Sequence, residues 1–324
     1  MHKEENSLLL GENVIKSEAI SKKQTIGDIQ RAIIFGHNGF IGSNLEKYLR
    51  NQTPEIELFG KSYPPFDLTN EKDASSLEHL FDKNTTVIML SALKKEHGDN
   101  IENFSKNIEM VKNLCNIIEK NPIKHFIFFS SAAVYGEDIN NTNITEDTQI
   151  FPTSYYGMAK YTSERLLSKT VNKQKGMDLT ILRPPVIYGP GDQPCYGPSG
   201  FIKSFLNEEK ITLWGDGTEM REFIFIGDVV NFVHKLIFQP YNGVINFASG
   251  NSHSFTEILE LISSITKLNV EINSKKRTKE KVDHHFNNEL IHRLFPKLTF
   301  TPIKEGIEKT IEYYQLSNKV EGVV

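Results

Sequence analysis

Short apolar segments alternate with amphipathic segments through the first half of the chain, and this pattern predicts strands joined by helices. From Ile101 to Ile118 the apolar residues recur every three or four positions, as on the buried face of a helix. The segment His125–Phe129 is mostly apolar, as in a strand that is covered on both faces. Strands are expected at residues 31–35, 56–59, 66–68, 86–90, 124–130 and 179–183, and helices at 40–50, 101–118 and 155–167. Such an alternation builds a parallel sheet.

The alternation ends after Pro185, where turn-forming residues fill positions 189–198. Beyond them short strands and helices are mixed, with segments expected at 211–213, 222–226, 243–247 and 255–268. We therefore expect an α/β fold: a Rossmann-like, doubly wound parallel sheet with a smaller mixed α/β C-terminal lobe. Residues 1–28 are polar and precede the first strand, so we expect them to form a flexible N-terminal extension.

Three glycines follow the first strand directly, at Gly36, Gly39 and Gly42. Glycine lets backbone amides and the N-terminus of a helix approach a pyrophosphate closely. Glycines at this spacing are a weak signal alone, but between a strand and a helix they are typical of a dinucleotide site. The sequence therefore predicts dinucleotide binding at this turn.

A tyrosine and a lysine stand four residues apart, at Tyr156 and Lys160 on an expected helix. This spacing places a phenol beside an ammonium group, whose charge favours the phenolate and lowers the pKa of the tyrosine. Ser131 follows a buried strand at its C-terminal end, where α/β sheets bind their ligands. A dinucleotide site with such a proton donor indicates a hydride-transfer enzyme.

The end of the second strand bears on the choice of cofactor. NAD enzymes place an Asp or Glu about 20 residues after the glycine turn, where it binds the ribose 2′-hydroxyl. Here the chain reads Gly60-Lys61-Ser62, with no carboxylate. A carboxylate facing a 2′-phosphate would be repelled by roughly 4 kcal/mol per charge pair at 4 Å. Its absence favours NADP(H), because Gly60 is expected to leave room for a 2′-phosphate that Lys61, together with Ser62, can bind. NAD(H) held through other contacts is the alternative.

Composition narrows the classes of partner. The 324 residues carry a net charge of −4, so nucleic acid is not expected as a partner. Two cysteines give neither a disulfide framework nor a set of metal ligands, so no metal is expected. No apolar run reaches the roughly 18 residues that span a bilayer. A cytoplasmic protein without membrane contact is the expectation.

With these motifs the chain resembles an extended short-chain dehydrogenase/reductase of the nucleotide-sugar epimerase/dehydratase/reductase group, over roughly residues 31–316. The resemblance implies Ser131, Tyr156 and Lys160 as catalytic residues. It implies a nucleotide-sugar substrate that contacts Ser131 and has its diphosphate bound by Arg221 and Arg277. It also implies a homodimer formed through the helices at 101–118 and 155–167. The implied cofactor contacts are Gly36, Gly39, Phe40, Ile41, Gly42, Lys61, Asp67, Leu68, Ala92, Lys94, Asn107, Tyr156, Lys160, Pro184 and Ile187.

Departures from the family pattern narrow the reaction. Dehydratases carry an Asp-Glu pair directly after the catalytic Ser or Thr, whereas Ala132 and Ala133 follow Ser131 here. Without these carboxylates an elimination lacks its acid and base, so the chain is not expected to be a dehydratase. The opening Gly36-His37-Asn38-Gly39 is similar to that of GDP-fucose synthases. Those enzymes carry a Cys for epimerisation at the position of Ala133, so their epimerisation is not expected here.

Three functions fit the sequence. An NADP(H)-dependent reductase of a nucleotide-activated 4-keto-(6-deoxy)hexose is favoured. The alternative is an NAD-dependent 4-epimerase of the UDP-galactose type, and a non-catalytic nucleotide-binding relative is less favoured. Residues 29–185, with return segments around 227–250, are expected to form the dinucleotide-binding domain. Residues 186–226 and 251–324 are expected to form the nucleotide-sugar-binding lobe.

Overall fold

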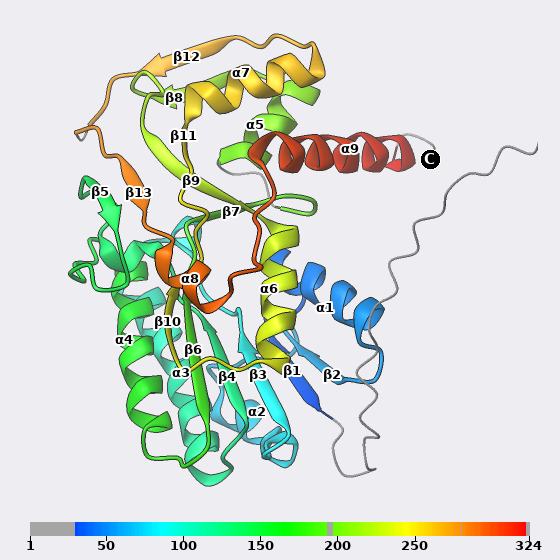
Figure 1. The fold of residues 1–324 in the computed structure, drawn as a ribbon, viewed down its shortest axis with the longest axis vertical. Coiled ribbons are helices and arrows are strands. Elements are labelled where there is room, and N and C mark those ends of the chain that lie inside the picture. Colours follow the sequence, from blue (N-terminus) through cyan, green and yellow to red (C-terminus); the bar gives the residue numbers. More distant parts are fainter. Residues whose placement is uncertain (1–29, 193–196, 279, 322–324) are drawn as a thin grey trace, which may run out of the picture.

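A six-stranded parallel sheet forms the centre of the protein (Figure 1). The structure is a computed structural model that describes residues 30–192, 197–278 and 280–321. The strands run β10-β6-β4-β3-β1-β2 across the sheet. From β1 the chain first forms the edge strand β2, and then adds β3, β4, β6 and β10 in order on the other side of β1. Their bounds are β1 (Arg31–Phe35), β2 (Glu57–Lys61), β3 (Thr85–Met89), β4 (His125–Phe129), β6 (Asp178–Arg183) and β10 (Gly243–Asn246). This is the Rossmann-like arrangement that the alternating pattern predicted.

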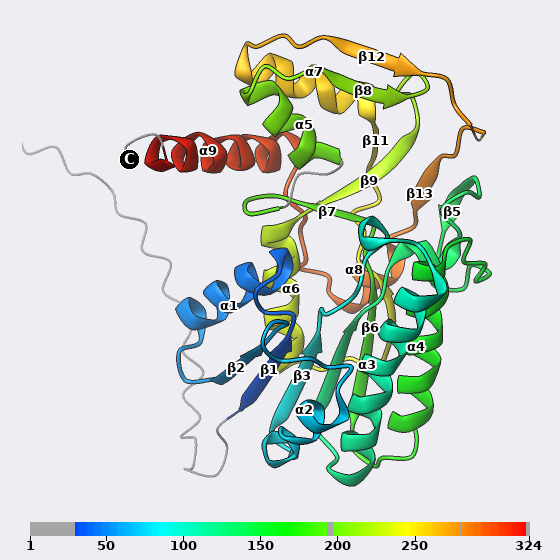
Figure 2. The ribbon, with the colours of Figure 1, turned by 180° about the vertical axis from the view of Figure 1, so that it is seen from behind.

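Helices cover both faces of the sheet, because alternate side chains of each strand point to opposite faces. On β1, Ile34 packs in a cluster with Leu45 of α1, whereas Ile33 and Phe35 pack in a second cluster with Leu114 of α3. One face carries α1 (Phe40–Gln52) and α6 (Ile226–Phe238). The other carries α2 (Glu71–Ser75), α3 (Ile101–Lys120) and α4 (Tyr155–Val171) (Figure 2).

A smaller lobe lies above the sheet in Figures 1 and 2. One of its sheets joins β11 (Ser252–Ser254), β9 (Met220–Phe225) and β7 (Val186–Tyr188), and another pairs β12 (Ile272–Lys275) with β8 (Ile211–Trp214). Its helices are α5 (Gly197–Leu206), α7 (Phe255–Thr266) and α9 (Ile303–Glu321), whereas α8 (Glu289–Leu294) lies against β10 of the main sheet. Strand β13 (His284–Phe286) pairs with β5 (Asn141–Ile144) and so ties the lobe to the loop before α4.

The expected short strand at residues 66–68 is wrong. The amide of Phe66 donates to the carbonyl oxygen of Ser62 at 3.2 Å, and that of Asp67 donates to the side chain of Asp73 at 2.9 Å, so neither amide is available to pair with a strand. Asp67 instead closes a turn, in which its side chain accepts hydrogen bonds from the amide and hydroxyl of Thr69. The polar segment 136–149, rich in Asn and Thr and free of a predicted element, contains the strand β5. The N-terminal extension expected at residues 1–28 lies outside the described residues. Among those described, no helix is long and apolar enough to span a bilayer.

Candidate active site

The glycine turn between β1 and α1 is closely packed. Gly36 has a φ of +88°, and a Cβ atom there would lie 2.9 Å from the amide nitrogen of Ser91. A Cβ atom on Gly42 would lie 2.2 Å from the carbonyl oxygen of Gly36, so only glycine lets α1 approach the turn this closely. Gly39 caps α1 without any side-chain hydrogen bond. No capping side chain therefore occupies the amides at the start of the helix, at Phe40 and Ile41, and a ligand can accept hydrogen bonds from them. The turn therefore fits a pyrophosphate at the N-terminus of α1.

At the end of β2 the structure corrects the expectation that Gly60 leaves open room for a 2′-phosphate. A Cβ atom on Gly60 would lie 2.4 Å from Cδ2 of His37, so the His37 ring fills the space beside this glycine. Ser62 was expected to help at the 2′-phosphate, but its hydroxyl bonds Nδ1 of His37 at 2.9 Å and accepts the amide of Asn38 at 3.0 Å. The ammonium group of Lys61 lies 5.8 Å from the centre of the Phe66 ring.

Two asparagines of α3 hold the other expected cofactor segments in place. Asn107 both accepts from and donates to the backbone of Leu93, at 2.8 and 3.0 Å, and so fixes the segment after β3 that carries Ala92 and Lys94. Asn113, which the sequence reasoning missed, donates to the carbonyl oxygen of Leu68 at 3.0 Å. The available signal was that Asn113 is a polar residue between Val111 and Leu114, two apolar residues of the predicted buried face of this helix.

The structure brings the three expected catalytic residues together. Ser131 precedes the short 3-10 helix η3 (Ala132–Tyr135), and Tyr156 and Lys160 lie on α4. A Cβ atom on Gly157 would lie 2.7 Å from the carbonyl oxygen of Ala133, so glycine allows α4 to pack directly on η3. The side chains of Ser131 and Tyr156 are hydrogen-bonded as a result.

The protonation of this pair differs from the expectation. Burial raises the pKa of Tyr156 above its usual value, the Ser131 hydrogen bond lowers it, and the charges of Glu137 and Glu96 raise it further. Lys160 was expected to lower the pKa of Tyr156, but the net shift is upward, and Lys160 is not among the groups that produce it. Burial lowers the pKa of Lys160 to about 7, although the nearby Glu164 raises it. Tyr156 is therefore a protonated phenol at neutral pH.

The backbone and α4 fix Lys160 within this site. Its ammonium group donates to the carbonyl oxygen of Phe129 at 2.6 Å and lies 5.6 Å from the centre of the Tyr156 ring. On the opposite side of the site, the carbonyl oxygen of Pro184 accepts the amide of Ala132 at 3.0 Å, and Ile187 lies on β7 just beyond. The expected catalytic and nicotinamide-side segments are thus directly joined.

Beneath the catalytic residues lies a buried polar network that the sequence reasoning missed. Nε and Nη2 of Arg183 donate to the two carboxylate oxygens of Glu164 at 2.9 and 2.6 Å. Ser130 donates to the same carboxylate at 2.5 Å, and Nη1 of Arg183 donates to the hydroxyl of Tyr135 at 2.8 Å. The Tyr135 hydroxyl in turn donates to Asn246 at 2.7 Å, which connects β10 to the network. Glu164 could have been suspected because it stands one helical turn after Lys160.

In the lobe, both expected diphosphate ligands border β9. Nη1 of Arg221 donates to the carbonyl oxygens of Met220, at 2.9 Å, and of Val282. Arg277 forms ion pairs with Asp216, at 2.8 Å, and with Glu219. Arg221 therefore lies within β9, whereas Arg277 reaches the residues just before this strand, and protein oxygens hold each arginine in place.

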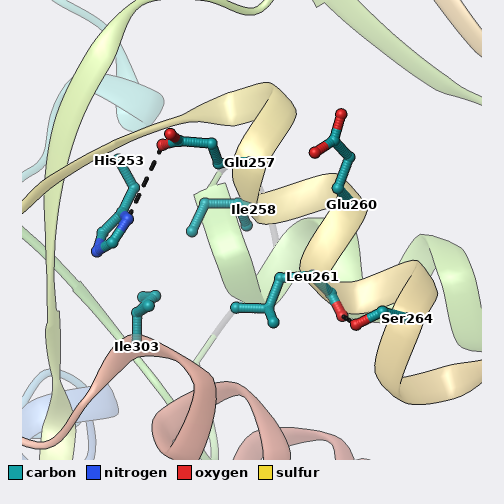
Figure 3. Close-up of a pocket in the computed structure, with 7 residues that line it drawn as sticks. All are labelled: His253, Glu257, Ile258, Glu260, Leu261, Ser264 and Ile303. Atoms are coloured by element: carbon teal, nitrogen blue, oxygen red, sulfur yellow. Dashed lines mark hydrogen bonds and ion pairs between the residues drawn. The ribbon is translucent and has the colours of Figure 1, made fainter.

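The lobe also contains a pocket of about 470 Å³ between α7 and the start of α9 (Figure 3). Its lining is partly apolar and partly acidic, and none of the expected site residues contributes to it. Nδ1 of His253 lies 3.9 Å from the Glu257 carboxylate at its edge. The pocket is therefore separate from the catalytic residues.

Comparison with known proteins agrees with this geometry. The sequence model of the NAD-dependent epimerase/dehydratase family matches residues 32–248. The uncharacterized UDP-glucose epimerase YtcB of Bacillus subtilis (strain 168) is 26% identical over 73% of this chain and 82% of its own length. GDP-6-deoxy-D-talose 4-dehydrogenase of Aggregatibacter actinomycetemcomitans is 28% identical over 75% of this chain and 82% of its own. The structure of MoeE5 in complex with UDP-glucose and NAD is 24% identical, with a TM-score of 0.78 over 89% of this chain and 99% of that one.

Proposed function

The chain belongs to the NAD-dependent epimerase/dehydratase family, and on this basis we propose that it is an NADP(H)-dependent reductase of a nucleotide-activated 4-keto-(6-deoxy)hexose. Members of the family are oxidoreductase-type enzymes that act on nucleotide sugars. The choice of the reductase rests on one observation, the carboxylate-free end of β2. There Gly60 and Lys61 replace the acidic residue that would bind an NAD ribose.

The catalytic residues suit reduction at neutral pH. Bound nicotinamide would supply the hydride, and the glycine turn together with Lys160 would hold the dinucleotide. Tyr156, a protonated phenol at neutral pH, donates its phenolic proton to the sugar oxygen, and Ser131 hydrogen-bonds the same oxygen. Arg221 and Arg277 bind the diphosphate of the substrate, which fixes the sugar relative to Tyr156. A relative described as a 4-dehydrogenase of GDP-6-deoxy-D-talose supports chemistry at carbon 4.

An NAD-dependent 4-epimerase is the second candidate, because it needs the same Ser131, Tyr156 and Lys160. The relative described as a UDP-glucose epimerase favours it, as does the similar structure that contains UDP-glucose and NAD. A non-catalytic relative is the third candidate, and the complete catalytic set argues against it. We also propose that the protein is cytoplasmic and forms a homodimer through α3 and α4.

One experiment separates these functions. The purified protein is analysed for bound nicotinamide and then titrated with NADPH and NADH. A reductase is isolated without tightly bound cofactor, prefers NADPH, and consumes it in stoichiometric amounts when a nucleotide 4-ketosugar is added. Tightly bound NAD, with interconversion of UDP-glucose and UDP-galactose and no net cofactor consumption, would replace the proposal by the epimerase. Binding of a dinucleotide without turnover of either sugar nucleotide would favour the non-catalytic relative.

A further inference from the structure

The imidazole of His37 occupies the position at the end of β2 that a carboxylate takes in NAD enzymes. We propose that His37 selects the cofactor by donating a hydrogen bond from Nε2 to a phosphate at the 2′ position of the adenosine ribose. This inference rests on the proposed dinucleotide site and assigns to it a residue that lies outside the glycine set.

The packing around Gly60 supports this position for the ring. A Cβ atom on Gly60 would lie 2.4 and 2.5 Å from Cδ2 and Cγ of His37, so any longer side chain at this position would displace the histidine. The missing side chain of Gly60 would therefore point toward the glycine turn, because the atoms nearest its Cβ position are those of His37. In this protein the side chain at that position therefore comes from His37 in the glycine turn and not from the last residues of β2.

The hydrogen bonds of Ser62 determine which nitrogen of His37 carries the proton. Ser62 is buried, and its oxygen accepts the amide of Asn38 at 3.0 Å. Its hydroxyl hydrogen needs an acceptor, and Nδ1 of His37 lies at 2.9 Å. With Nδ1 as the acceptor, the neutral ring carries its hydrogen on Nε2, which is thereby a donor. Ser62 thus orients His37 and favours the tautomer that carries its hydrogen on Nε2.

The chemistry at this end of β2 matches a 2′-phosphate better than a 2′-hydroxyl. A ribose hydroxyl in NAD donates its hydrogen to a carboxylate, whereas a phosphate offers only acceptor oxygens and negative charge. Nε2 of His37 is a donor, and the next residue after Gly60 is the cation Lys61. A hydrogen bond to a charged phosphate is stronger than one between neutral groups. The site is therefore expected to discriminate between the two cofactors through His37.

The test compares dissociation constants for NADPH and NADH in wild type and four variants, each checked by circular dichroism. We expect His37→Ala to weaken NADPH binding by about 10- to 100-fold, as for loss of a hydrogen bond to a charged group, and NADH binding by less than about threefold. Ser62→Ala should cause a smaller loss of the same sign, because the ring loses its orientation. His37→Gln, which keeps a donor, should restore part of the preference. The matched control His79→Ala, at an exposed histidine distant in sequence, should change neither constant.

Each other outcome has a defined meaning. Equal losses for both cofactors in His37→Ala would assign the histidine to the structure of the turn and overturn the inference. An unchanged ratio in all four variants would do the same. If His37→Ala does not fold, the comparison rests on Ser62→Ala and His37→Gln. Wild type that binds NADH as well as NADPH would overturn the proposed reductase, whatever the variants do.

Discussion

Replacing Arg183 by methionine is expected to destabilise the protein strongly, because it leaves a carboxylate buried without its counter-ion. The side chain of Glu164 is only 3% exposed and receives two hydrogen bonds from Arg183, at 2.9 and 2.6 Å. In Arg183→Met the Ser130 hydroxyl is the remaining side-chain donor to this carboxylate, and Tyr135 also loses a partner. Breaking a buried ion pair from one side costs about 3–5 kcal/mol, so we expect a loss of this size in the free energy of unfolding.

The double variant Arg183→Met, Glu164→Leu is the matched control. Removing both charges replaces the ion pair by apolar groups, which is often neutral or stabilising. We therefore expect the double variant to be at least about 2 kcal/mol more stable than Arg183→Met alone. Urea unfolding is followed by circular dichroism, because the single tryptophan, Trp214, is 57% exposed and distant in sequence from this pair. A loss below about 1 kcal/mol in Arg183→Met, or a double variant no more stable than the single one, would refute the reasoning.

Three further predictions address activity, pH and assembly. Tyr156→Phe should lower turnover by about 10²–10⁴-fold while NADPH affinity and the melting temperature stay unchanged; wild-type turnover would exclude Tyr156 as the proton donor. Burial raises the pKa of Glu222 from 4.5 to about 7. Between these pH values the folded state binds a proton that the unfolded state has released, so the free energy of unfolding falls as the pH rises from about 4.5 to 7. Glu222→Gln should therefore melt closer to wild type at pH 5 than at pH 8, and an identical difference at both would contradict this. Sedimentation at micromolar concentration should give a dimer formed through α3 and α4, where Ile101 and Met158 are exposed. Met158→Glu should weaken this dimer, and a monomeric wild type would rule the dimer out.

Much of the main sheet could be predicted because its signals are local. The strands around Ile33 and Phe126 are short apolar runs, and the glycine turn has a spacing that few other structures need. The pairing of Tyr156 with Lys160 also follows from helical periodicity alone. Such features depend on neighbours within one turn or one strand.

The remaining parts depend on contacts between distant segments, which the sequence does not encode locally. Residues 66–68 look like a strand, but the carbonyl oxygen of Leu68 accepts a hydrogen bond from Asn113 of α3, 45 positions later. The absence of a side chain at Gly60 suggested open space, yet His37, 23 positions earlier, fills it. The buried partner of Glu164 is Arg183, 19 residues later and on another element. Desolvation of Tyr156 likewise comes from the assembled site, so its raised pKa could not be anticipated.

The return of β10 to the main sheet has a consequence for the order of events during synthesis. Strand β6 ends at Arg183, but its outer edge is paired only by β10, which ends at Asn246. Residues 184–242, which include much of the lobe and helix α6, leave the ribosome between these two strands. Until they have emerged, an apolar parallel strand presents an unpaired edge, which is a template for pairing with other chains. Ribosome-bound chains that end before residue 243 should therefore be the species most in need of a chaperone.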